Sequence, residues 1–187
     1  MAIIPILKPG EIHSRLSLSN GDTTTLRSPD WKDLDGLTGY INDLVAEHAQ
    51  IGITASVTRE AEAQWLGQRL SDIENGRIIM LVADVAGQVV SVGEVERLTG
   101  ERSHTGYLGI GVARKKRGTG LSRGMMMALL ELARKIGLKI VILDVFATNM
   151  AAIRLYEKAG FEQTGKIPKG ILRDGAYIDL VRMTTEL

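Results

Sequence analysis

Four consecutive cations stand directly before a glycine turn, in the stretch Arg114-Lys115-Lys116-Arg117-Gly118-Thr119-Gly120. An apolar stretch, 107–112, precedes this run, and a pattern of helical spacing, 121–136, follows it. A helix N-terminus exposes unpaired N–H groups and a partial positive charge, so it attracts anions. Glycines let the backbone approach an anion closely, and Lys and Arg side chains add charge. The stretch therefore predicts a phosphate-binding site where a strand passes into a helix.

Other interpretations of this stretch compete with the phosphate site. A solvated basic loop would need neither the strand before it nor the helix after it. A Walker A loop requires G-K-S or G-K-T, which does not follow the glycines here. A Rossmann turn would use Gly118, Gly120 and Gly124 with Asp144 on the ribose, but the glycine spacing is one residue too long and little chain follows Asp144. Nucleic-acid binding is disfavoured because aromatic residues make up 4% of the chain and none interrupts the basic run.

A second set of residues that could take part in ligand binding or catalysis lies further along the chain. Asn149, Ala152 and Tyr156 have the spacing i, i+3, i+7, which places them on one face of a short helix. Asn149 is the expected N-cap of that helix, and Gly160 the expected terminator. An amide, a small residue and a phenol on one face suit an extended ligand with a reactive end. Taken alone, Tyr156 would more simply be a core tyrosine with a satisfied hydroxyl.

Composition restricts the class of protein. The 187 residues carry a formal net charge of +1 at pH 7, so the basic run is a local feature and no nucleic-acid partner is expected. The absence of cysteine excludes disulfides, thiolate nucleophiles and zinc–thiolate sites, and we expect no metal. No apolar stretch approaches the roughly 20 residues of a membrane span, and residues 1–16 lack the features of a signal peptide. We expect a cytoplasmic protein with one domain, 1–187.

The elements that position these residues follow an order typical of a mixed α/β fold. A hairpin is expected around Asn20-Gly21. Helices are expected at 29–44, with Pro29 at its first position and Trp31 on its apolar face, and at 58–76, 121–136 and 149–160. Strands are expected at 77–85, 88–98, 104–113, 138–146, 161–167 and 176–183. Residues 1–20 would form an arm or hairpin extension that either pairs with a neighbouring subunit or covers an edge strand.

Together the two motifs resemble those of the GNAT N-acetyltransferase superfamily. The family's acyl-CoA signature, [QR]-x-x-G-x-[GA] at a helix start, is similar to residues 115–120, with Lys115 at the first position. Lysine keeps the positive charge there but not the planar bidentate geometry of arginine. The family's second motif falls on Val145, Asn149, Ala152, Tyr156, Gly160 and Phe161. With the element order, the resemblance extends over roughly residues 22–187.

This resemblance implies a fold and a donor site. The fold is a mostly antiparallel central sheet flanked by helices, in which one parallel strand pair, 107–112 and 138–146, splays apart. The pantetheine arm of acetyl-CoA, the co-substrate, would lie in that gap against the backbone of 109–112, with its pyrophosphate on the N–H groups of 117–122. The residues expected to bind acetyl-CoA are Ile110, Gly111, Val112, Lys115, Lys116, Arg117, Gly118, Thr119, Gly120, Leu121, Ser122, Asn149, Ala152 and Tyr156.

The same resemblance implies transfer of an acetyl group to an amine. Tyr156 would act as general acid toward the leaving thiolate, whose basicity resembles that of cysteine with a pKa of about 8.5. Because the chain has no cysteine, an acyl-cysteine is impossible and direct transfer in a ternary complex is expected. We favour Glu94 as general base, with Glu96 and His104 as other candidates. Tyr107 occupies the position where many relatives carry a carboxylate.

The acceptor is the part that these patterns determine least. The resemblance places its walls at 48–57 and in a loop at 166–176. Near pH 7 an α-amine is neutral to roughly a tenth and a lysine amine to less than a thousandth. Without a strong base, the α-amine of a protein N-terminus or of a small molecule is therefore the better acceptor. A homodimer is one expected assembly, and the alternative to an enzyme is a non-catalytic CoA- or nucleotide-binding or regulatory module.

Overall fold

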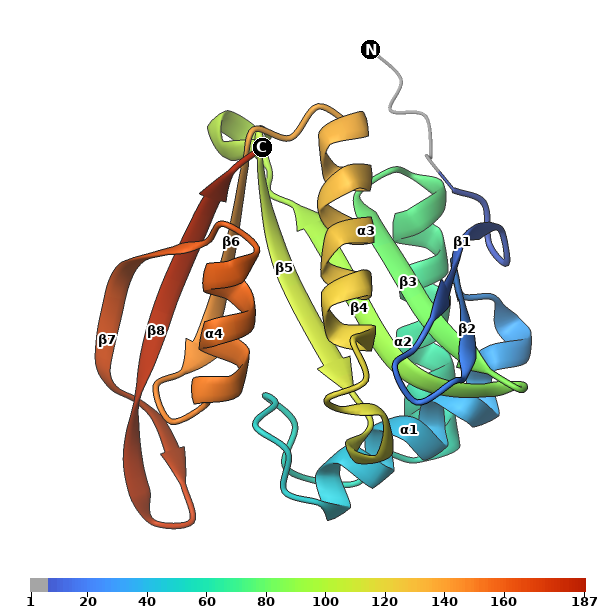
Figure 1. Ribbon diagram of the computed structural model, residues 1–187, viewed down its shortest axis with the longest axis horizontal. Helices are drawn as coiled ribbons and strands as arrows, with labels where there is room; N and C mark the ends of the chain where they lie inside the picture. The colour runs from blue at the N-terminus through green and yellow to red at the C-terminus, as the bar shows by residue number, and fades with distance from the viewer. Residues whose placement is uncertain (1–6) are drawn as a thin grey trace.

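A single eight-stranded sheet forms the centre of the computed structural model, which describes residues 7–187 (Figure 1). The strand order is β1-β2-β3-β4-β5-β6-β8-β7, and every neighbouring pair is antiparallel except β5 and β6. The strands are β1 Ile12–Ser17, β2 Thr23–Arg27, β3 Ile78–Val85, β4 Gln88–Arg97, β5 Thr105–Val112, β6 Ile140–Phe146, β7 Glu162–Arg173 and β8 Ala176–Glu186. This arrangement confirms the expected mixed α/β fold. It also removes the Rossmann alternative, which requires a mostly parallel sheet.

Helices cover both faces of the sheet. They are α1 Leu34–Ala46, α2 Arg59–Glu74, α3 Leu121–Lys135 and α4 Met150–Lys158. On one face, α3 and α4 pack on an apolar cluster that includes Met125 and Leu129. On the other face, α1 and α2 pack on a second cluster that includes Leu66 and Leu70 (Figure 1). Strand β3 lies between the two clusters and contributes side chains to both, which explains its nearly continuous apolar sequence.

The only parallel pair among the described strands separates along its length. Strands β5 and β6 pair only at Thr105–Ile140, Gly106–Val141 and Tyr107–Ile142. Beyond Tyr107, β5 stays with β4 as far as Val112, whereas β6 stays with β8 as far as Phe146. A gap therefore opens in the middle of the sheet (Figure 1). The predicted splay is confirmed, and it begins directly after Tyr107.

The N-terminal hairpin packs against the predicted phosphate site. Its strands β1 and β2 flank a turn in which Gly21 has a φ of 87°, and β1 forms one edge of the sheet. The backbone N–H of Ser19 donates to the carbonyl of Thr119 at 3.1 Å. Residues 1–6 of the expected arm lie outside the described residues. The hairpin thus extends the sheet at one edge and contacts the glycine turn.

The first helix begins later than the sequence predicts. Pro29 is not its first residue, because a 3-10 turn, Trp31–Asp33, intervenes before α1. The Asp30 side chain caps this turn, and Asp33 is buried against the guanidinium of Arg27, with two N–O distances of 2.6 Å. This ion pair fixes the turn outside the helix. Trp31 is consequently 58% exposed and not on the buried face of α1, so that prediction is wrong.

The predicted loop at 166–176 is also wrong. Strand β7 continues to Arg173 and β8 begins at Ala176, so residues 166–173 belong to a strand that pairs with β8 on both sides of an irregularity between Ile167 and Ile171. The reversal is confined to Asp174 and Gly175, with φ values of 50° and 76°. The sequence "IPKGILRDG" has few strand-forming signals, since Pro and two glycines interrupt it. Pairing with the more apolar β8 supplies the hydrogen bonds that make it a strand.

Candidate active site

The glycine turn leads into α3 as the sequence predicts. Gly118 and Gly120 have φ values of 75° and 89°, in the region where side chains are disfavoured, and a Cβ added to either would meet only open space. The first helical hydrogen bond runs from Gly124 N–H to Gly120 C=O, at 3.0 Å. Within residues 7–187, the N–H groups from Gly118 to Arg123 find no protein acceptor. A row of free donors on an open surface is the geometry that a phosphate requires.

The four cations before this turn divide into two pairs. Arg114 and Lys115 are exposed, and no described carboxylate pairs with either. Lys116 pairs with Asp22 of the N-terminal hairpin, and Arg117 with Glu47 at the end of α1. The Arg117 Nε also donates to the Val112 carbonyl at 3.0 Å. Two cations therefore remain available for a bound anion, and the other two hold the turn against its neighbours.

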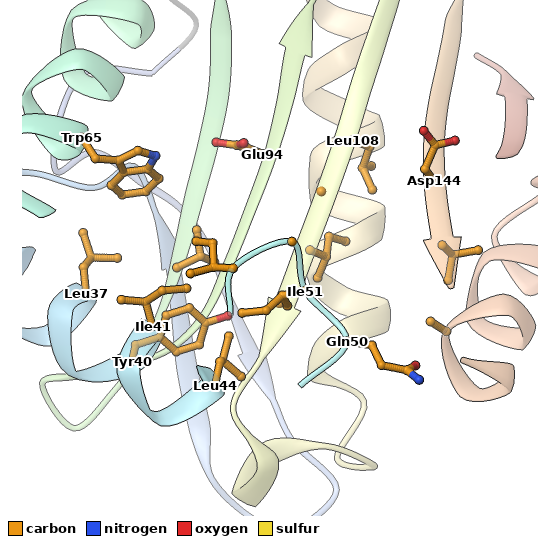
Figure 2. A pocket seen from close by; sticks show the side chains of 18 of the residues that line it. Leu37, Tyr40, Ile41, Leu44, Gln50, Ile51, Trp65, Glu94, Leu108 and Asp144 are labelled. Atoms are coloured by element: carbon orange, nitrogen blue, oxygen red, sulfur yellow. The ribbon is translucent and has the colours of Figure 1, made fainter. Parts of the chain in front are cut away.

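A cavity of about 560 Å³ occupies the gap between β5 and β6 (Figure 2). Of the predicted site residues, it is lined by Glu94, Ile110, Gly111, Asn149, Ala152 and Tyr156. The glycine turn and Val112 lie outside this lining. Residues 50–53 and Val57 also line the cavity, so the predicted wall at 48–57 is present. No residue of 166–176 lines it, although Arg173 Nη1 donates to the Ala49 carbonyl at 3.0 Å.

Tyr156 lies on the α4 side of the cavity with the two residues predicted to share its face. The Asn149 side chain accepts from Ala152 N–H at 3.2 Å and caps α4, as expected. Tyr156 is buried, its ring centroid lies 6.0 Å from that of Phe161, and no described residue hydrogen-bonds its hydroxyl. Burial raises the pKa of Tyr156 above the ordinary tyrosine value. A phenol that stays protonated and faces the gap can donate a proton there.

Glu94 alone of the three predicted base candidates lines the cavity, where it projects from β4 (Figure 2). Burial raises the pKa of Glu94, and the nearby Arg69 guanidinium partly offsets that effect. Arg69 Nε lies 3.5 Å from Glu94 Oε2, too poorly aligned for a hydrogen bond. Glu96 lies outside the lining, and His104 is exposed at the paired end of β5. The geometry therefore favours Glu94 over the other two.

A second carboxylate reaches the gap from β6. Asp144 accepts from the Tyr107 hydroxyl at 3.0 Å and from the guanidinium of Arg182 at 2.8 and 2.7 Å. The Arg182 guanidinium lowers the pKa of Asp144, and burial raises the pKa of Tyr107 to about 12. Asp144 is therefore held ionised by a paired cation, which makes it a weaker proton acceptor than Glu94. Tyr107 closes the paired end of the cavity.

Sequence reasoning missed the residues that α1 and α2 contribute. Tyr40 lies in the cavity wall, 7% exposed, and its hydroxyl has no hydrogen-bond partner among the described residues. Arg69, Glu62 and Trp65 of α2 line the same wall. A polar residue on a helix is ordinarily solvent-exposed, so Arg69 and Glu62 carry no signal in the sequence. Tyr40 lies on the apolar face of its helix and is indistinguishable there from a core residue.

Comparisons with known proteins agree with this geometry. The model of the Acetyltransferase (GNAT) family matches residues 39–161. The chain belongs to the GNAT acetyltransferase family. It is therefore an N-acetyltransferase with acetyl-CoA as acetyl donor. In this GNAT protein, the free N–H groups at 118–123 and the open gap beyond Tyr107 fit the phosphates and the extended arm of that donor.

Relatives of this GNAT protein are named as acetyltransferases of amino acids, of amino-acid analogues and of a ribosomal protein. It is 29% identical to an L-methionine sulfoximine/L-methionine sulfone acetyltransferase of Pseudomonas aeruginosa, over 88% of this chain and 95% of that protein. It is 31% identical to the L-amino acid N-acetyltransferase AaaT of Escherichia coli, over 73% of this chain and 85% of that protein. Among solved structures, a ribosomal-protein-alanine N-acetyltransferase of Brucella melitensis is 30% identical and superposes with a TM-score of 0.77, over 87% of this chain and 99% of that one.

Two general properties of the described chain bear on the site. No helix among residues 7–187 is both long and apolar enough to cross a membrane. In the same residues, no group of three or more His, Asp or Glu side chains is arranged to hold a metal ion.

Proposed function

We propose that this enzyme acetylates the α-amine of a free amino acid or of a close analogue, by direct transfer in a ternary complex. One observation carries the proposal: Arg69 is the only cation among the described residues that line the cavity, and its guanidinium makes no hydrogen bond to any of them. Its Nε lies 3.5 Å from Glu94. A guanidinium has five donors in a planar fork that matches a carboxylate. An acceptor that has both a carboxylate and an amine can therefore bind its carboxylate to Arg69 and place its amine next to Glu94.

Glu94 and Tyr156 have complementary proton roles in this proposal. Acetyl-CoA, when bound, supplies the thioester from which the acceptor amine takes the acetyl group. Glu94 accepts the proton of the amine, directly or through water, and burial makes its carboxylate more basic than an ordinary glutamate. Tyr156, which burial keeps protonated, provides a proton for the departing sulfur. With no cysteine in the chain to carry the acetyl group, direct transfer is the simplest sequence of steps.

The backbone of β5 provides the third element of the mechanism. Alternate residues of β5 bond to β4, as the 2.9 Å bond from Ala113 N–H to Val90 C=O indicates. In an antiparallel pair the intervening residues point the other way, so the N–H groups of Leu108 and Ile110 are directed into the gap. Donors fixed there stabilise negative charge on an oxygen in a site from which water is largely excluded.

The proposal is tested by thiol release from acetyl-CoA with three matched acceptors: an amino acid, its carboxamide and the amine that lacks the carboxyl group. We expect the amino acid to have the highest kcat/KM. Arg69→Gln should reduce kcat/KM for the amino acid roughly 10- to 100-fold, the range for loss of a charge-assisted hydrogen bond, with a smaller effect on the amine. Arg59→Gln, on the exposed side of the same helix, is the control. Equal rates for all three acceptors would contradict the proposal.

A protein N-terminus is the second candidate acceptor, because the 30% identical Brucella structure is a ribosomal-protein-alanine N-acetyltransferase. The same assay distinguishes the two candidates. Free alanine and a peptide that begins with alanine have the same reacting amine, but only the free amino acid places its carboxylate next to that amine. A higher kcat/KM for the peptide would favour the protein N-terminus as acceptor. It would also contradict the proposed role of Arg69, which is to bind the α-carboxylate of a free amino acid.

A further inference from the structure

Glu62 is an acid buried in the cavity wall. It is the fourth residue of α2 and only 7% exposed, whereas Glu60 in the same turn is exposed. Glu62 is one of the residues that line the cavity. The positive end of the helix dipole favours an acid in this first turn, which explains the residue type but not the burial. An acid in the first turn gains as much from the dipole on the exposed side.

No described residue compensates the Glu62 carboxylate. Within residues 7–187 no hydrogen bond or ion pair reaches it, and burial alone raises its pKa. The two other acids that line the cavity are matched by cations: Glu94 lies beside Arg69, and Asp144 is bound by Arg182. A buried carboxylate is costly unless a cation or hydrogen-bond donors reach it. The missing partner of Glu62 is therefore expected to come from a ligand in the cavity.

The neighbours of Glu62 suit an organic cation. Glu62, Trp65 and Arg69 have the spacing i, i+3, i+7, so an acid, an indole and a guanidinium follow one another along the cavity side of α2. The backbone positions of Glu62 and Arg69 are about 10 Å apart along the helix, at 1.5 Å per residue. A ligand that binds both groups therefore has its carboxylate and a positive charge several bonds apart. A simple neutral amino acid has only its α-amine near its carboxylate.

We infer that Glu62 forms a subsite for a second positive charge, so that the acceptor class favoured by this cavity is a basic amino acid. This inference rests on the proposed function, because it uses Arg69 for the α-carboxylate and Glu94 for the reacting α-amine. The distal ammonium or guanidinium of the acceptor pairs with Glu62. Trp65 and the apolar residues Ile53 and Val57 surround the aliphatic part between the two ends.

The experiment compares L-lysine with L-norleucine, which has a similar length but no distal charge, as acceptors of the α-acetyl group. Product analysis identifies the acetylated nitrogen. We expect a kcat/KM for lysine roughly 10- to 100-fold above that for norleucine, since a charge-assisted pair has that range of effect. Glu62→Gln, which keeps the shape and removes the charge, should remove most of this preference. Glu60→Gln, the same change on the exposed face of α2, should keep it.

Each outcome decides the inference. A preference that disappears in Glu62→Gln and persists in Glu60→Gln supports the subsite. Turnover of norleucine equal to that of lysine in the wild-type enzyme contradicts the subsite but not the proposed function. A lysine preference that survives Glu62→Gln also contradicts the subsite. It would mean that Glu62 is protonated and neutral in the wild-type enzyme, so that its replacement by glutamine removes no charge. Failure of every free amino acid as acceptor contradicts the proposed function and the subsite together.

Discussion

Three tyrosines face the cavity, and their surroundings give them different roles. Tyr107 donates to Asp144, and Tyr40 is enclosed in the α1 wall without a partner. Tyr156 is the one on α4, two turns after the Asn149 cap and on the predicted ligand face. Burial raises the pKa of all three, so the hydroxyls stay protonated at neutral pH. We therefore propose Tyr156 as the proton donor because of its position and not because of its acidity.

The Tyr156→Phe variant should have a kcat roughly 10²–10⁴ lower, the range for loss of a general acid, with little change in acetyl-CoA affinity. Steady-state rates and donor binding by calorimetry would measure both quantities. Tyr177→Phe, which changes a 64% exposed tyrosine on β8, is the matched control. A kcat for Tyr156→Phe within about twofold of wild type would leave Tyr156 with a packing role only.

The pH profile should report Glu94. A general base works when deprotonated, so kcat/KM rises with pH through the pKa of Glu94, which burial places above that of an ordinary glutamate. Arg69 lowers that pKa, so Arg69→Gln should move the rise to higher pH. The profile is measured with an amine acceptor that lacks a carboxylate, which separates this effect from acceptor binding. No movement relative to the Arg59→Gln control would argue against Glu94 as the base.

At the scale of the elements, the turn before α3 combines an unusual backbone geometry with the proposed binding of acetyl-CoA. Gly120→Ala should cost about 1–2 kcal/mol, because alanine is disfavoured at a φ of 89°. It should also abolish most of the thermal stabilisation by acetyl-CoA, since a Cβ would enter open space at the turn where the phosphates are proposed to bind. Gly137→Ala, at a φ of 80° after the other end of α3, has the same strain and no donor site. Equal stabilisation of both variants by acetyl-CoA would place the donor elsewhere.

Two glycines of β5 differ in what an added side chain would contact. A Cβ on Gly111 would overlap the Tyr40 hydroxyl, whereas one on Gly109 would meet nothing. Gly111→Ala should therefore lower the free energy of unfolding by about 1–3 kcal/mol. Tyr40→Phe removes an unpartnered buried hydroxyl, so it should be nearly neutral alone and should recover much of the loss in the double variant. Chemical denaturation measures the cycle, and additive effects would contradict this packing.

The Gly109→Ala variant tests function, whereas Gly111→Ala and Tyr40→Phe test stability. Gly109 is cross-strand from Glu94, so an added methyl group would lie in the cavity without disturbing the core. We expect an unfolding midpoint close to that of wild type and a higher KM for acetyl-CoA.

At the scale of the whole molecule, the segment 47–57 joins the two halves that the splay separates. Glu47 pairs with Arg117 on the glycine turn, and Gln50 Nε2 donates to Thr148 Oγ1 before α4 at 2.8 Å. Ile51 of the same segment reaches into the cavity (Figure 2). The segment thereby connects the glycine turn, the α4 side and the cavity. Its position depends on contacts with residues that are distant in sequence.

Weakening one of these contacts should affect the acceptor more than the donor. Gln50→Ala removes a hydrogen bond of about 1 kcal/mol, so acceptor KM should rise several-fold while the Kd for acetyl-CoA stays unchanged. Gln163→Ala, on the exposed face of β7, serves as the control. A parallel loss of donor affinity would mean that the segment belongs to the acetyl-CoA site.

The sequence by itself determined the features that depend on neighbouring residues. The turn at Gly118 and Gly120, the capped helix with Asn149 and Tyr156, and the element order follow from periodicity, capping and glycine conformation. These are local rules, and the structure reproduces them within a few residues. The cluster at Asp30 and Asp33 shows where they fail. There a buried ion pair with Arg27 overrides the helical pattern and turns Trp31 outward.

Only the tertiary structure decided what surrounds the reacting groups. The place where β5 leaves β6, the pairing of β7 with β8, and the approach of Arg69 to Glu94 join residues that are far apart in the chain. Such contacts depend on sheet order and strand register, which no short pattern encodes. A charged residue on α2 has the same sequence signal whether it faces water or a cavity. The acceptor end of the site is therefore visible only once α2 is packed against β4.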